Sequence, residues 1–170
     1  ERLLGRALED GLITDAAIAQ TQAQAKAFWA VRENQSGAQK PEGAAWKHDV
    51  SVPVSRIADF IEQATAAVQK HDPRVRVVAF GHVGDGNVHY DVLRPAGGSD
   101  EAHNEGRDAG SRIVHDIVDS MEGSISAEHG LGAAKTADAL RYKSAVEVEA
   151  LRAIRNALDP KRIMNPRVLF

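Results

Sequence analysis

A predicted β-hairpin constrains the fold of this chain more than any other feature. Its two strands, Val75–Phe80 and Val88–Leu93, are rich in valine and each carry an aromatic residue. Between them lies Asp85–Gly86, a pair that favours a two-residue type I′ turn because both positions need φ > 0. Such a turn pairs His82 with His89 and places their Cβ atoms about 5 Å apart on one face of the sheet.

Two imidazoles side by side can supply two ligands of a metal ion. Asp91 and Phe80 lie two residues away along the strands, so they share this face. The chain has 7 histidines and no cysteine, so a metal would have to bind His, Asp or Glu. The same pattern also fits two half-buried histidines that only hydrogen-bond their neighbours. The residues alone leave both interpretations open.

Composition narrows the classes of function. The 170 residues are 43% hydrophobic and 26% charged, which is ordinary for a globular domain. The net charge of −3 argues against general binding to nucleic acid or to membrane surfaces. No apolar run approaches the roughly 20 residues of a membrane span. The chain begins with Glu1 and no signal-like segment follows, so we expect a piece of a longer protein. The expected compartment is the cytoplasm.

The segment 46–127 is expected to form an α+β core. Its pattern predicts, in order, a strand over 46–52, a helix from Ser55, the two hairpin strands, a helix over 99–120 and a short strand over 123–127. The order β-α-β-β-α-β is typical of the ferredoxin-like, split βαβ fold. In that fold an antiparallel sheet carries helices on one face, the first strand neighbours the third, and the other face is left to receive a partner.

Further helices are expected on either side of this core. They cover 2–8, about 15–32 with Asp15 as N-cap, and 145–158, and a loop is expected over 34–45. The last helix is predicted to bury four apolar side chains, Val148, Leu151, Ile154 and Leu158. We expect residues 1–170 to form one domain.

Two titratable residues, Glu128 and His129, stand where the last predicted strand becomes a glycine-rich loop. Such positions direct side chains into a cleft at the edge of a sheet. Glu128 could complete a His₂Glu metal set with positions open for a substrate, and His129 could act as a general base near neutral pH. A solvated loop that happens to hold an acid and a histidine is the alternative.

Two cations, Arg32 and Lys47, lie close to tryptophans and border the predicted loop. Near a metal they could hold a carboxylate, although isolated basic residues are more often surface charge. Gly84–Gly86 lies in a hairpin rather than between a strand and a helix, so we expect no dinucleotide site there. Neither a G-x-G-x-x-G nor a Walker sequence occurs elsewhere in the chain.

The chain resembles the FAD-linked oxidase C-terminal domain in two paired signatures. These are Gly81-His82-x-Gly84-Asp85-Gly86-Asn87-x-His89 and Ser126-x-Glu128-His129-Gly130-x-Gly132. Three more segments fit the same family: Trp29-x-x-Arg32-Glu33, Lys47–Pro53, and the ending with Asp159-Pro160 and Asn165-Pro166. The resemblance covers nearly the whole chain.

The resemblance implies a flavin enzyme that oxidises a D-2-hydroxy acid to the 2-oxo acid by hydride transfer to FAD. In this family a separate N-terminal domain binds FAD, and the C-terminal domain covers the substrate. The resemblance assigns a divalent metal, zinc or else manganese or iron, to His82, His89 and Glu128. It also implies that His129 takes the proton of the substrate hydroxyl.

Further site residues follow from the resemblance alone. Arg32 and Lys47 match positions that bind the substrate carboxylate, and Ser36 falls near a further hydroxyl contact. Asn165 would lie towards the flavin. Asp91 departs from the pattern, because dehydrogenases that act on 2-hydroxyglutarate typically carry Asn there. Its carboxylate could contact the metal or repel an acidic substrate.

Other classes of function stay open at this point. One is a non-catalytic ferredoxin-like module for ligand binding or regulation, and another is a metal-dependent hydrolase. The pair Glu128–His129 favours an enzyme, because a binding module does not need it. If the chain is an oxidase domain, it should by itself bind little FAD and be inactive, and its open sheet face could pair two copies into a homodimer.

Overall fold

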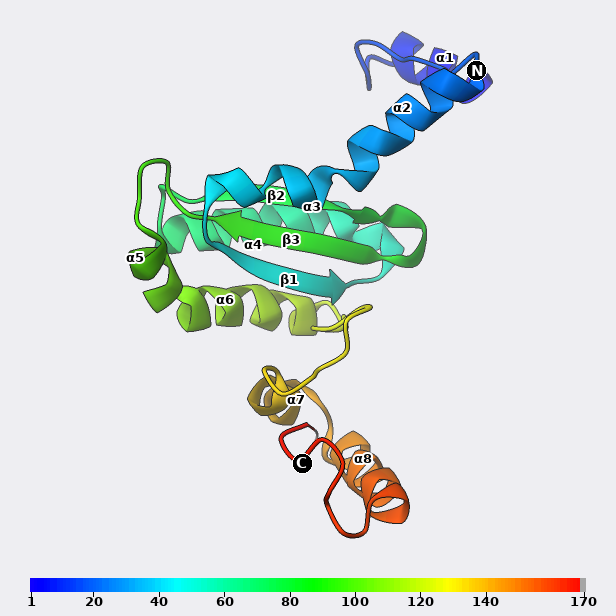
Figure 1. Ribbon diagram of the computed structural model, residues 1–170. Coiled ribbons are helices and arrows are strands. Elements are labelled where there is room, and N and C mark those ends of the chain that lie inside the picture. Colours follow the sequence, from blue (N-terminus) through cyan, green and yellow to red (C-terminus); the bar gives the residue numbers. More distant parts are fainter. Residues whose placement is uncertain (169–170) are drawn as a thin grey trace. The chain divides into compact units, whose positions relative to one another are not determined.

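The computed structural model describes residues 1–168, and the chain divides into two units that are described separately (Figure 1). The first unit is Glu1–Pro41 and the second begins at Glu42. The helices of the first unit are α1 (Arg2–Glu9), α2 (Gln22–Glu33) and α3 (Gln35–Ala38). The expectation of one domain over the whole chain stays a prediction.

Helix α2 begins later than the sequence pattern predicted. The Thr21 hydroxyl accepts the N–H of Gln24 at 3.2 Å, and Gln24 Oε1 accepts the N–H of Thr21 at 3.1 Å, which is a capping box. The predicted cap, Asp15, instead accepts the N–H of Ala16. The predicted loop over 34–45 was wrong in part, because it contains α3 and a 3₁₀ turn, Lys40–Glu42.

The second unit is built on an antiparallel sheet. Its strands are β1 (Ala45–Ser51), β2 (Arg76–His82) and β3 (Asn87–Leu93), in the spatial order β1-β3-β2. The helices that follow β1 and β3 are α4 (Ile57–His71), α5 (Asp100–Glu105) and α6 (Arg107–Ser120). Figure 1 shows α4 and α6 on the same side of the sheet, and they pack against each other. The predicted α+β, ferredoxin-like order is confirmed, with the first strand beside the third.

The predicted fourth strand is reduced to one bridge to β1. The N–H of Ser51 donates to the Ser124 carbonyl at 2.9 Å, and the N–H of Ser124 donates to the Ser51 carbonyl at 2.8 Å. The Ser124 hydroxyl then donates to the Ser126 carbonyl at 2.9 Å. Such local side-chain bonds compete with a strand ladder. The chain stays at the edge of β1, where the N–H of Ala127 donates to the Asp49 carbonyl at 3.1 Å.

The predicted direct pairing of His82 with His89 is wrong. β2 and β3 pair His82 with Asn87 and Phe80 with His89, so the loop of the hairpin is Val83–Gly86. The register therefore differs from the prediction by two residues. A shift of two keeps every side chain on its face, so the two histidines remain on one face as diagonal neighbours.

The longer turn follows from the different preferences of its two central residues. The Asp85 carboxylate accepts the N–H of Asn87 at 3.1 Å, which favours a turn without positive φ at Asp85. Gly86 alone takes a left-handed φ of 80°, and its N–H closes on the Val83 carbonyl at 3.4 Å. A Cβ on Gly86 would clash with the carbonyl oxygen of Val52. A type I′ turn needs positive φ at both positions, and this chain supplies it at one.

The core lies between the sheet and its helices. Its fully buried large side chains are Val50, Tyr90, Val92, Phe60, Val68, Val114 and Val118. Trp46 closes one end, because its indole N–H donates to the His103 carbonyl at 2.8 Å and its ring stacks on the His103 ring at 4.4 Å. Gly110 of α6 lies so close to Trp46 that a Cβ would clash with the indole. Close packing thus explains a residue of low helix propensity inside α6.

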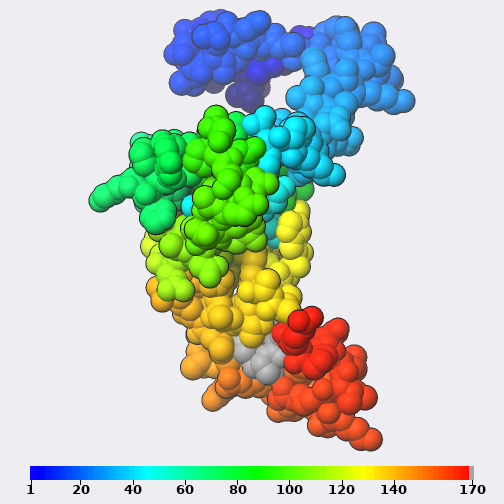
Figure 2. All heavy atoms as spheres, turned by 60° about the vertical axis from the view of Figure 1, so that its left-hand side comes forward, coloured from blue at the N-terminus to red at the C-terminus, as the bar shows by residue number. Residues whose placement is uncertain are grey.

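The remaining helices are α7 (Thr136–Tyr142) and α8 (Ala145–Leu158). The sequence pattern did not predict α7, but it predicted α8 with these bounds. Val148 is buried and Leu151 is half-buried, but Ile154 is 58% exposed and Leu158 is 75% exposed. Their predicted burial was wrong because α8 lies beyond α6, away from the sheet (Figure 2). Among the described residues, no helix has the length and apolarity to span a membrane.

Candidate metal and substrate site

Strand register creates a patch of polar side chains on the sheet face opposite the core. Lys47 pairs with Asp91, and Asp49 pairs with His89, which in turn pairs with Phe80. Paired residues share a face, so these side chains are neighbours. We call this patch the polar face, and its charged, histidine and amide members are Lys47, Asp49, His82, Asn87, His89 and Asp91.

Glu128 joins the two histidines that the resemblance assigns as metal ligands. Its Oε1 lies 3.3 Å from His82 Nδ1, and its Oε2 lies 3.7 Å from His89 Nε2. Asp85 of the hairpin loop also approaches His82, with Oδ2 at 3.9 Å from Nδ1. The structure therefore brings the three assigned ligands together, although His82 reaches the group diagonally rather than from a position opposite His89.

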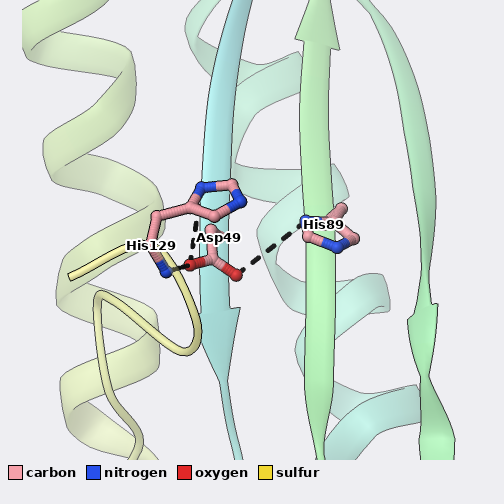
Figure 3. A group of neighbouring side chains, drawn as sticks. All are labelled: Asp49, His89 and His129. Carbon is pink, nitrogen blue, oxygen red and sulfur yellow. Dashed lines mark hydrogen bonds and ion pairs between the residues drawn. The ribbon is translucent and has the colours of Figure 1, made fainter. Parts of the chain in front are cut away.

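Asp49 is a site residue that the sequence reasoning did not single out. It is 3% exposed, and its Oδ2 accepts the backbone N–H groups of Glu128 and His129, each at 2.8 Å. Its Oδ1 accepts Nδ2 of Asn87 at 3.0 Å. Figure 3 shows its carboxylate between two imidazoles, with Oδ1 3.9 Å from His89 Nδ1 and Oδ2 3.6 Å from His129 Nδ1.

The buried Asp49 carboxylate is held in its charged form. Burial acts to raise the pKa of Asp49, but hydrogen bonds from His129, Glu128 and Asn87 outweigh it and keep that pKa below its usual value. The sequence did contain a signal for this residue. Asp49 alternates with Lys47 on the polar side of a predicted strand that was expected to neighbour the strand of His89.

Two groups of side chains could hold a metal ion at this place. Asp49, His89 and His129 each offer a ligand atom within 4.8 Å of the others. Asp49, however, already accepts three hydrogen bonds, so an ion bound to its oxygens would compete with the bonds that hold Glu128 and His129. The set His82, His89 and Glu128 offers two imidazole nitrogens and a carboxylate, which suits zinc, manganese or iron. We therefore favour the second set.

The predicted substrate residues of the second unit lie on the polar face. Lys47 Nζ is 3.9 Å from Asp91 Oδ2; the Lys47 side chain is 57% exposed and that of Asp91 is 5% exposed. Arg32 and Ser36 belong to the first unit, in α2 and α3, and their place relative to the polar face stays a prediction.

The predicted flavin residue, Asn165, lies in the segment that follows α8. Its backbone has a positive φ of 43°, and its carbonyl accepts a hydrogen bond from Arg155 Nη2 at 3.2 Å. In Figure 1 this segment lies beside α8. The place of Asn165 relative to the polar face stays a prediction.

The other face of β1 buries a histidine in a different environment. His48 is 2% exposed, its Nδ1 lies 2.7 Å from the Tyr90 carbonyl oxygen, and its Nε2 lies 3.1 Å from the Ser111 hydroxyl. Its ring meets that of His115 edge-on at 5.5 Å. Burial lowers the pKa of His48 to about 4, although its bond to Tyr90 opposes this shift. His48 is thus a neutral residue of the core at pH 7.

Comparisons with known proteins identify the family to which the chain belongs. The family described as "FAD linked oxidases, C-terminal domain" matches residues 1–169. The probable mitochondrial D-2-hydroxyglutarate dehydrogenase of Oryza sativa subsp. indica is 38% identical over 167 residues, which are 98% of this chain and 28% of that protein. The D-2-hydroxyglutarate dehydrogenase of Xanthomonas citri pv. viticola is 36% identical over 163 residues, 96% of this chain and 34% of that protein.

A third relative, the D-2-hydroxyglutarate dehydrogenase of Stutzerimonas stutzeri, is 36% identical over 165 residues, 96% of this chain and 35% of that protein. This chain thus spans about a third of the length of the curated relatives that it matches. Because the family match covers nearly every residue, the chain belongs to the family of FAD linked oxidases, C-terminal domain.

Proposed function

We propose that this chain is the substrate- and metal-binding domain of an FAD-dependent enzyme that oxidises a D-2-hydroxy acid to the 2-oxo acid. One observation carries the proposal: the Glu128 carboxylate lies between His82 and His89, at 3.3 Å and 3.7 Å, and His129 follows it in the chain. Oxidation of a hydroxyl needs a group that accepts its proton, whereas a binding module does not. The family and the names of the relatives support the same class of reaction.

His82, His89 and Glu128 would hold the divalent ion, since this chain has no cysteine to offer a thiolate. When bound, the ion would polarise the substrate hydroxyl and lower its pKa, and the flavin would accept the hydride. A set of three protein ligands leaves room in the coordination sphere for a substrate. Zinc, manganese and iron all accept this set of donors.

The residues around the ion would bind the substrate and take its proton. His129 would accept the hydroxyl proton on Nε2, because its Nδ1 faces Asp49 at 3.6 Å and its side chain is 67% exposed. Lys47 and Arg32 would bind the substrate carboxylate, and Ser36 would add a hydroxyl contact. Asn165 would serve the flavin rather than the acid.

FAD would be bound mainly by an N-terminal part of a longer polypeptide. The curated relatives are about three times as long as the matched segment. This chain carries neither a G-x-G-x-x-G nor a Walker sequence that would cradle a dinucleotide. We therefore expect the isolated chain to show no turnover with added FAD.

The test uses the full-length flavoprotein, mixed without oxygen with D-2-hydroxyglutarate or with D-lactate. The wild type should lose its oxidised flavin absorbance with at least one acid. His129→Asn should keep its metal but reduce flavin at least about 100-fold more slowly, because a positioned proton acceptor contributes 10²- to 10⁴-fold. His82→Ala should lose the metal, whereas His71→Asn, an exposed histidine of α4, is the matched control. Flavin reduction by neither acid, or an unchanged rate in His129→Asn, would contradict the proposal.

A further inference from the structure

We propose that Asp49 is the positioning residue of this site. Its single carboxylate fixes the loop that carries Glu128 and His129, and it turns the rings of His89 and His129 so that the Nε2 atom of each is presented for chemistry. The inference rests on the proposed function, because it concerns one proposed metal ligand and the proposed proton acceptor.

The loop is held by Asp49 in place of a strand ladder. The Oδ2 atom accepts the N–H groups of Glu128 and His129, each at 2.8 Å, and the Asp49 carbonyl accepts the N–H of Ala127 at 3.1 Å. Three consecutive backbone groups therefore bond to one residue of β1. Loss of the carboxylate would leave two of these N–H groups without their acceptor.

The same carboxylate faces one nitrogen of each imidazole (Figure 3). Its oxygens lie 3.9 Å from His89 Nδ1 and 3.6 Å from His129 Nδ1, so a closure of less than about 1 Å brings each to hydrogen-bond length. An ionised carboxylate only accepts hydrogen bonds, so it favours a proton on the nitrogen that faces it. Both rings then carry Nδ1–H and present the Nε2 lone pair.

The direction of the second nitrogen fits this assignment. His89 Nε2 lies 3.7 Å from the Glu128 carboxylate, on the side of the proposed metal. Metal-binding histidines commonly donate their other N–H to a carboxylate, which fixes the tautomer and raises the basicity of the ligand nitrogen. The rings of His89 and His129 stack at 5.8 Å, so one carboxylate reaches both.

Asp159 shows what a carboxylate with only a structural task does in this chain. It is buried like Asp49, and its two oxygens accept the N–H groups of Ile163 at 3.0 Å and Met164 at 2.9 Å. Burial acts to raise the pKa of Asp159, but these two backbone hydrogen bonds, followed by the charges of Arg155 and Arg162, keep it below its usual value. Among its described partners there is no histidine. Asp159 therefore provides a control for the loss of charge at a buried carboxylate that holds a loop.

An Asn at position 49 separates the two tasks. Its amide oxygen can still accept the N–H groups of Glu128 and His129, so the loop keeps its anchor. Its NH₂ group then replaces the oxygen that faces His89 and Asn87. A donor in this place favours the Nε2–H form of His89, which puts a proton on the nitrogen that a metal needs.

The test measures the chain itself, labelled with ¹⁵N-histidine. Two-bond ¹H–¹⁵N spectra of the metal-free protein at about pH 8 report which ring nitrogen carries the proton. We expect Nδ1–H for His89 and His129 in the wild type and Nε2–H for His89 in Asp49→Asn. Zinc affinity, by competition with a chelating dye, should fall about 10- to 100-fold in Asp49→Asn and stay within about twofold in Asp159→Asn.

Each result separates this inference from the proposed function. Protons on Nε2 of His89 and His129 in the wild type would overturn the role of Asp49 without any variant. A wild-type zinc affinity in Asp49→Asn would overturn it as well. Nδ1–H on both rings in a wild-type chain that binds no zinc would support the role of Asp49 and overturn the proposed metal site.

Discussion

The two faces of strand β1 bury neighbouring titratable residues in opposite ways. His48, on the helix side, is 2% exposed, and burial lowers its pKa to about 4. Asp49, the next residue, is 3% exposed on the polar face. Burial opposes its charge, but the donors around it keep the pKa of its carboxyl below the usual value. One residue is buried as a neutral group and the other as an ion.

The difference teaches that the partners of a buried group decide whether burial neutralises it or is outweighed. His48 meets a carbonyl and a hydroxyl, which satisfy a neutral ring. Asp49 meets three N–H donors and two imidazoles, which satisfy an anion and extend its influence to the site. Changes on the helix side should therefore alter stability, and changes on the polar face should alter binding and chemistry.

The largest effect on stability should come from Phe60→Ala on the helix side of the sheet, compared with Phe80→Ala on the polar face. Phe60 of α4 is fully buried, 5.4 Å from the Tyr90 ring, so Phe60→Ala should lower the free energy of unfolding by about 3–5 kcal/mol. Phe80 is half-buried on the polar face, 5.0 Å from the His89 ring, and Phe80→Ala should cost at most about 2 kcal/mol. Urea unfolding measures the loss of unfolding free energy in both variants. Equal losses would contradict the claim that the helix side carries more of the stability than the polar face.

The next prediction concerns how the free energy of unfolding depends on pH, and it involves only the helix side of the sheet. The pKa of His48 is lower in the folded state, at about 4, than its ordinary value of 6.5, so the unfolded chain binds more protons between these values. The contribution of His48 to stability is present above pH 6.5 and is lost as the pH falls towards 4. At about pH 5 the loss should reach about 2 kcal/mol.

The measurement compares the wild type with His48→Gln, whose side chain does not titrate but can still donate to the Tyr90 carbonyl. Urea unfolding at several pH values gives the difference in free energy between the two proteins. That difference should narrow by about 2 kcal/mol from about pH 7.5 to about pH 5. A difference that is constant with pH would show that His48 is not the residue whose protonation destabilises this face.

Sequence patterns predicted the framework of this molecule well, because alternation and helical periodicity are local. The first three strands, the place of the first beside the third and the bounds of α8 agree with the structure, whereas the fourth strand is reduced to a bridge. The hairpin register was missed because a bond from the Asn87 N–H to Asp85 competes with the turn that the pair Asp85–Gly86 prefers. The burial of Ile154 and Leu158 was missed because an apolar stripe does not say what covers it.

The candidate site was predicted unevenly for a related reason. His82, His89, Glu128 and His129 stand in motifs that can be read along the chain. Asp49 becomes part of the site only because it pairs with His89 on the neighbouring strand and accepts the N–H groups of a loop about 80 residues away in sequence. A motif search finds residues that are near in sequence, whereas positioning residues are near in space.

The smallest effect on stability should come from Lys47, on the polar face. Its ammonium lies 3.9 Å from Asp91 and its side chain is 57% exposed, so water screens the pair and Lys47→Gln should change the free energy of unfolding by less than about 1 kcal/mol. In the full-length flavoprotein the same variant should raise the KM for the hydroxy acid about 10-fold or more with a smaller change in kcat, because a carboxylate contact is lost. Arg56 forms an exposed ion pair with Asp59 at the start of α4. Arg56→Gln is therefore the control, and it should change neither the free energy of unfolding nor the KM. A Lys47→Gln protein with reduced stability and an unchanged KM would reverse the roles assigned to the two faces, because the polar face would then serve the fold rather than the substrate.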